Sequence, residues 1–172
     1  VKTEGEREDG NGHSDAVEAQ VLYNRAATPF WDFQIGLRHD SDHGLERNWA
    51  VIGFHGTSPY LFEIDTELFI SQDGRSALRF ETEYEIPLTQ QLILSPDVEL
   101  NFYGKDDPVR GIRTGLSNGE AGLRLRYEIR REFAPYVGVN WEKLFGGSAD
   151  LARFRGLATQ DTRLVIGIKA WF

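Results

Sequence analysis

The 172 residues predict an all-β fold, a closed antiparallel transmembrane β-barrel of about ten strands with short periplasmic turns and longer extracellular loops. Apolar side chains recur at every second position, which is the period of a strand and not of a helix. The alternating runs are longer than the ~5–6 residues common in soluble sheets. The connections between runs alternate between short and long, as they do in outer-membrane barrels.

Each run puts apolar residues on one face and charged residues on the other. Phe62 and Ile64, for example, alternate with Glu63 and Asp65. The predicted strands are 1–8, 15–26, 31–40, 47–57, 60–72, 74–87, 91–104, 116–131, 134–145 and 160–172. Their number is even, as bacterial barrels require.

The connections fall into two sets. Short ones are expected at 27–30, 57–59, 87–91 and 131–134, and long polar ones at 9–14, 40–47, 104–115 and 146–160. Only the turn at Asp73–Gly74 breaks the alternation. We expect the long set outside the cell, with aromatic residues such as Trp49 and Phe69 forming an interfacial girdle toward that end. The alternative fold is a soluble barrel of lipocalin type, with the apolar face inward.

The composition excludes several classes of partner, membrane segment and metal site. Nineteen basic and 27 acidic residues give a net charge of −8, which argues against nucleic acid as a partner. No apolar run reaches the ~18–20 residues of a spanning helix. The mean hydropathy of −0.43 resembles that of a soluble protein, but an alternating barrel averages to a polar value. With no cysteine, thiolate metal sites and cysteine nucleophiles are excluded.

Catalytic motifs are poor, so we expect a protein that is not an enzyme. No serine has a histidine and an acid at a recognisable motif spacing, although an outer-membrane hydrolase is kept as the enzymatic alternative. If the apolar face meets lipid, the opposite face lines the lumen and is rich in acids. It is a salt-bridged, hydrated network, a path that attracts cations, or both, since the acids outnumber the bases. This acidic ladder consists of Glu63, Asp65, Glu67, Glu81, Glu83, Glu85, Asp97 and Glu99.

Histidines and aspartates near the long loops are the candidate metal ligands. The candidate site is formed by His39 and His43 with Asp40 or Asp42, and His13 lies on the same side of the barrel. Imidazole and carboxylate suit Cu(II), Ni(II) or Zn(II), although a solvated polar loop explains the same residues. His55 is expected to be structural. Asp106 and Asp107 form a second candidate, which is either a cation site or an Asx-type turn.

Several blocks of sequence closely resemble the copper resistance B proteins of the Gram-negative outer membrane. The clearest are residues 100–108, 120–129 and 131–136, with shorter matches at 30–32 and 49–53. The resemblance implies an outer-membrane barrel that serves copper resistance and homeostasis, and we expect this barrel to be a monomer by default. Its expected partners are copper ions, membrane lipid and periplasmic copper-binding proteins.

Members of that family usually carry a methionine- and histidine-rich segment ahead of the barrel. We expect residues 1–172 to be the single barrel domain, with the signal peptide and that extension absent from this chain. Because the chain has no methionine or cysteine, its own chemistry points to Cu(II) that is bound, retained or passed at the membrane. The alternative is a passive structural barrel whose copper binding lies in the absent segment.

Overall fold

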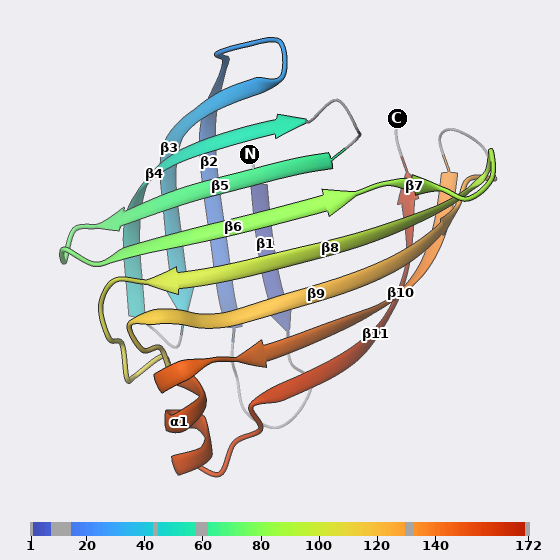
Figure 1. Cartoon of the computed structure of the whole chain (residues 1–172). Coiled ribbons are helices and arrows are strands. Elements are labelled where there is room, and N and C mark those ends of the chain that lie inside the picture. Colours follow the sequence, from blue (N-terminus) through green and yellow to red (C-terminus); the bar gives the residue numbers. More distant parts are fainter. Residues whose placement is uncertain (1, 8–14, 43–44, 58–61, 130–132, 171–172) are drawn as a thin grey trace.

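The computed structural model describes the backbone of residues 2–7, 15–42, 45–57, 62–129 and 133–170. In these ranges the chain forms an 11-stranded antiparallel sheet and one short helix (Figure 1). The strands are β1 (Lys2–Arg7), β2 (Asp15–Ala26), β3 (Trp31–Asp42), β4 (Leu45–Thr57), β5 (Phe62–Ser71), β6 (Ser76–Tyr84), β7 (Ile86–Pro87), β8 (Leu92–Tyr103), β9 (Gly115–Tyr127), β10 (Phe133–Leu144) and β11 (Gln160–Ala170).

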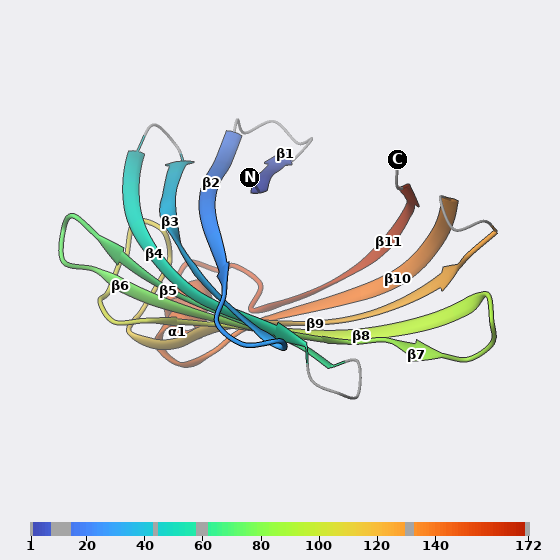
Figure 2. The same ribbon diagram turned by 90° about the horizontal axis from the view of Figure 1, so that it is seen from above.

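Neighbours in the sheet follow chain order from β1 to β11, and the two-residue β7 is a short addition that pairs with β8. The predicted all-β class and its ten longer antiparallel strands are confirmed. The sheet is strongly curled, with β1 and β11 at its two edges (Figure 2). The described residues contain no pairing between β1 and β11, so closure of the barrel stays a prediction. No helix among the described residues is long and apolar enough to span a membrane.

The polar face of the sheet is the concave one. Gln20 on β2 donates a hydrogen bond to Glu67 Oε1 on β5 at 2.6 Å, although two strands lie between them. Only the inside of a curl brings such distant strands together. The convex face carries exposed apolar side chains, among them Val21, Ile35, Leu37, Phe54, Leu68, Ile70, Leu123, Val139, Leu164 and Ile166.

Two aromatic residues do not lie where the sequence placed them. Trp49 and Phe69 are 5% and 3% exposed and pack with Val51 on the concave face. The prediction that they form an interfacial girdle is wrong, because both are in phase with the charged positions of their strands. Arginines cover their rings: Arg38 lies 4.9 Å from the Phe69 ring centre, and Arg47 lies 5.6 Å from that of Trp49.

The predicted long loop at 146–160 contains a helix, α1 (Gly146–Phe154). One side of this helix is buried, at Ser148, Ala149 and Ala152, and it lies against β9. The Ser148 hydroxyl accepts a hydrogen bond from the Arg113 backbone N–H at 2.8 Å and lies 2.6 Å from the Ser117 hydroxyl. The small residues that look like loop composition therefore serve a close contact between α1 and the sheet.

Candidate cation site on the concave face

A row of acidic residues crosses the concave face at right angles to the strands. Residues opposite each other in an antiparallel pair share a face, so the register identifies the row one strand at a time. From β3 to β11, with β7 outside it, the row contains Asp32, His55, Asp65, Glu81, Glu99, Glu120, Glu142 and Asp161. We call this set the acidic row. It places seven carboxylates and one imidazole on successive strands.

Carboxylates that lie directly opposite each other repel, and Cβ atoms at such positions are only ~4.5–5.5 Å apart. Part of this repulsion is offset by neighbours on the same face. Arg79 Nε lies 3.5 Å from Glu99 Oε1, and Asn140 donates a hydrogen bond to Glu120 Oε1 at 2.6 Å. At the β11 end, Arg163 Nε lies 2.8 Å from Asp161 Oδ2. The row is therefore only partly neutralised by these contacts.

A cavity of about 300 Å³ adjoins the row where it crosses β4, β5 and β6. His55, Asp65 and Glu81 line it, together with Glu67 and Arg79. His55 Nδ1 lies 3.4 Å from Asp65 Oδ2, while Asp65 Oδ1 is buried and has no hydrogen-bond partner in the described part of the chain. An unsatisfied buried carboxylate oxygen is costly, so this position favours a ligand with positive charge or a donor group.

The predicted acidic ladder maps onto this surface. Asp65, Glu81 and Glu99 belong to the acidic row. Glu63, Glu83 and Asp97 form a second, parallel row through the pairs Glu63–Glu83 and Glu83–Asp97. Glu67 accepts the hydrogen bond from Gln20.

Glu85 lies just beyond β6 and pairs with Arg126 at 2.9 Å. Sequence reasoning predicts that His55, in phase with the lumen, is structural, and it does not single out Asp161, because only the strand register brings both into line with the acids.

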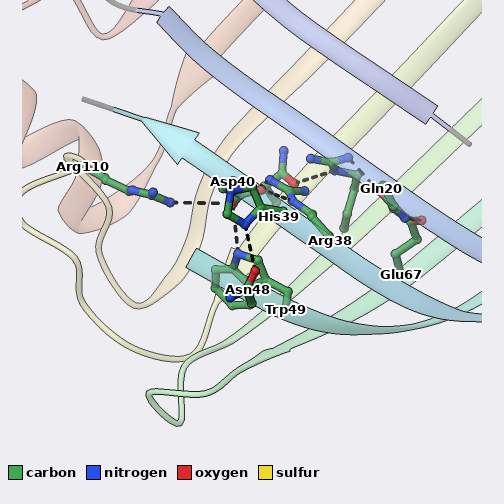
Figure 3. Close-up of polar contacts among 10 residues, drawn as sticks. Gln20, Arg38, His39, Asp40, Asn48, Trp49, Glu67 and Arg110 are labelled. Atoms are coloured by element: carbon green, nitrogen blue, oxygen red, sulfur yellow. Dashed lines mark hydrogen bonds and ion pairs between the residues drawn. The ribbon is translucent and has the colours of Figure 1, made fainter. Parts of the chain in front are cut away.

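The predicted histidine site is not assembled among the described side chains. His39 is exposed on the convex face, where its Nδ1 lies 2.8 Å from Asn48 Oδ1. Asp40 points to the concave face and is 7% exposed. It contacts Arg38 at 2.6 Å, the Trp49 Nε1–H at 2.9 Å and Arg110 at 3.7 Å (Figure 3). The pairing of His39 with Asp40 is therefore wrong, because adjacent residues of a strand face opposite sides.

The other members of that prediction are not tested. His13 and His43 lie outside the described residues, as does the side chain of Asp42. Within the described part of the chain, no group of three or more His, Asp and Glu residues is arranged to hold a metal ion.

Asp106 and Asp107 contact arginines, which favours the Asx-type turn over the cation site among the two interpretations of these residues. Asp107 Oδ2 lies 2.9 Å from Arg47 and 3.3 Å from Arg75. Burial alone raises the pKa of the Asp107 carboxyl, but the hydrogen bond from Arg47 and the charges of Arg75 and Arg47 outweigh it and hold this pKa below its usual value. Asp106 Oδ1 accepts hydrogen bonds from the Thr114 hydroxyl and backbone N–H, each at 2.7 Å, so a turn is the better description.

A curled antiparallel sheet of long strands, apolar outside and charged inside, defines a porin-like fold. A NanC porin solved in a rhombohedral crystal form has a similar fold, with a TM-score of 0.64 and 11% identity, covering 92% of this chain and 80% of that chain. The family model described as copper resistance protein B precursor matches residues 1–172, and the chain belongs to the copper resistance protein B family.

Two relatives support the assignment. Over 172 residues the chain is 46% identical to copper resistance protein B of Escherichia coli and 44% identical to its homolog in Pseudomonas syringae pv. tomato. All of this chain is covered, against 57% and 58% of the relatives, so it spans a little over half their length. The predicted family is confirmed.

Proposed function

We propose that this chain is the membrane-spanning barrel of an outer-membrane copper resistance protein and that its acidic row binds hydrated Cu²⁺. The protein acts in copper homeostasis without being an enzyme, as a monomer that retains copper or passes it to periplasmic copper-binding proteins. The observation that carries this proposal is the acidic row in a member of the copper resistance protein B family.

The chemistry of the row supports copper as the cargo. Imidazole nitrogen and carboxylate oxygen are both ligands for Cu²⁺, which binds such sites more tightly than the other common divalent ions of its series. The cavity beside His55 and Asp65 offers both donor types, and no described residue makes a hydrogen bond with Asp65 Oδ1 there. The surplus of negative charge raises the local concentration of cations before any ligand is exchanged.

The convex face supports the membrane location. Its apolar side chains are among the most exposed in the protein, with Leu164 at 70% and Ile166 at 74%. Apolar patches of this extent indicate contact with a partner or a membrane. The 12-residue strands β2, β3, β8 and β10 also exceed the ~9–11 residues that a tilted strand needs to cross a bilayer.

Cu²⁺ titration of the chain in detergent, followed by electron paramagnetic resonance, tests the proposal. We expect saturable binding with the signature of an imidazole nitrogen. His55→Gln should abolish that signature, and Asp65→Asn should weaken binding about tenfold, the effect of losing one charged ligand contact. The matched control is His39→Gln, which removes an imidazole from the convex face and should change nothing.

Two results would contradict the proposal. If His39→Gln abolishes the nitrogen signature and His55→Gln leaves it intact, copper binds near the long loops and not on the acidic row. If the chain binds no Cu²⁺ at all, the second candidate holds: a passive barrel whose copper binding lies elsewhere in a longer protein. That candidate is favoured by the coverage of only 57–58% of the relatives.

A further inference from the structure

A second cavity on the concave face has the opposite charge from the acidic row. It measures about 70 Å³ and lies beneath the segment 105–112, at the end of the sheet that the long connections join. Two acids line it, Asp40 and Asp107. Six bases line it as well: Arg38, Arg47, Arg75, Arg79, Lys105 and Arg110. We call it the basic cavity.

The arginines near the loop share a single carboxylate. Asp107 Oδ2 lies 2.9 Å from Arg47 and 3.3 Å from Arg75, and the Arg75 Nη1 also donates to the Asp106 backbone oxygen at 2.8 Å. Arg75 Nε is buried and has no hydrogen-bond partner among the residues that the structure describes. Lys105 lines the cavity from an exposed position and makes no ion pair with any described residue. Two arginines therefore share one carboxylate, and Lys105 adds a third positive charge to the same cavity.

The surroundings strengthen this imbalance. The side chains of Arg47 and Arg75 are 15% and 23% exposed, so water screens them only in part. The aromatic rings of Trp49, Phe69 and Tyr103 form the apolar part of the cavity wall. A lysine or carboxylate in this position can lose its charge by titration, but an arginine cannot, because it stays protonated at any accessible pH. The positive charges of Arg47 and Arg75 can therefore be offset only by anions, and Asp107 Oδ2 is a single oxygen that both of them share.

We propose that the basic cavity binds a small free oxyanion, of the phosphate or carboxylate class, beside Asp107. Arg75 Nε and the Lys105 ammonium supply the donors, and Arg47 supplies a second positive charge. The guanidinium fork matches the spacing of two oxygens on one such anion. The volume fits this class: it exceeds the roughly 10–15 Å³ that one water needs and is far below the ~300 Å³ of pockets for drug-sized ligands.

The Asp107 carboxylate resembles the proposed anion, because both place negatively charged oxygen beside Arg47 and Arg75. It already presents one carboxylate oxygen, Oδ2, to both Arg47 and Arg75 from the loop above them. Removing its charge should therefore make the cavity bind an external anion more tightly, whereas removing a cation should make it bind less tightly. These opposite signs separate a specific site from a general effect of basic charge.

Isothermal titration of the full chain with inorganic phosphate, at low ionic strength in a maltoside detergent that contains no phosphate, tests the proposal. We expect one saturable site for phosphate. Chloride should bind more weakly, because it lacks the two oxygens that accept hydrogen bonds from two N–H groups of one guanidinium. Arg75→Gln should weaken phosphate binding about tenfold. Lys105→Gln should weaken it several-fold, and because Lys105 is exposed this variant keeps the test valid if Arg75→Gln does not fold.

Arg153→Gln is the matched control. It removes an arginine of α1 that is 64% exposed and pairs with Asp150, and it should leave phosphate binding unchanged. Asp107→Asn should bind phosphate several-fold more tightly. The proposal is overturned if the wild-type chain binds no phosphate, if Lys105→Gln and Arg153→Gln weaken binding equally, or if Asp107→Asn weakens it.

Discussion

Val139→Arg tests whether the convex face meets lipid. Val139 is 44% exposed and lies between Leu123 on β9 and Leu164 on β11, so its side chain belongs to the apolar surface. It is the seventh of the 12 residues of β10. At ~3.4 Å per residue and a tilt of ~40°, six steps from Phe133 correspond to about 15 Å along the membrane normal. That is close to the middle of an apolar band ~25 Å tall.

A basic residue at that depth of a lipid-facing strand costs about 2–4 kcal/mol. We therefore expect Val139→Arg to lower the free energy of unfolding by this amount in lipid vesicles, measured by urea titration with tryptophan fluorescence. Asn140→Arg is the matched control, because Asn140 lies one residue further along on the concave face and contacts Glu120. It should cost far less. A loss below about 0.5 kcal/mol for Val139→Arg, the range of ordinary surface substitutions, would refute a lipid-facing convex surface.

Three further predictions follow from single contacts. Trp49→Phe removes the hydrogen bond to Asp40 and should cost about 1.5–3 kcal/mol of unfolding free energy by the same urea assay, with no loss if that bond is not formed. Gly122→Ala places a methyl group against the Asp97 carboxylate, so it should cost about 1–3 kcal/mol and be rescued by Asp97→Ala. The pKa of Asp106 is lowered from 3.8 to about 2 by hydrogen bonds from Thr114 and Arg113, so its contribution is complete above pH 3.8 and is lost as the pH falls through about 2. Amide exchange at Thr114 should follow this profile, and Asp106→Asn should abolish it.

Much of the fold follows from the sequence because a period of two repeats over long runs. The strand at 15–26 was predicted with the ends that the structure gives, and most others differ by a few residues. The helix α1 was missed because nine residues rich in Gly, Ala and Ser look like a loop when their contact with β9 is unknown. Periodicity also shows which residues share a face of the sheet, but not whether that face contacts lipid, water or other side chains. For this reason the sequence predicts Trp49 and Phe69 at a membrane interface, although they pack on the concave face.

For the candidate site too, the sequence predicts some features and not others. That the acids share one face is a local property and was predicted from residues such as Glu81 and Glu99. That they line up with His55 and Asp161 depends on the strand register, which turn geometry and packing set. The role of Asp107 depends on Arg47 and Arg75, which are distant in sequence and come together only when the loop folds over the sheet.

The separation of charge on the concave face makes its two regions differ in the small ions that they attract. The basic cavity owes most of its charge to arginines and attracts anions. The acidic row owes its charge to carboxylates and attracts cations. The concave face therefore attracts small ions of opposite sign in two separate places, and added salt should weaken both attractions because it screens charge.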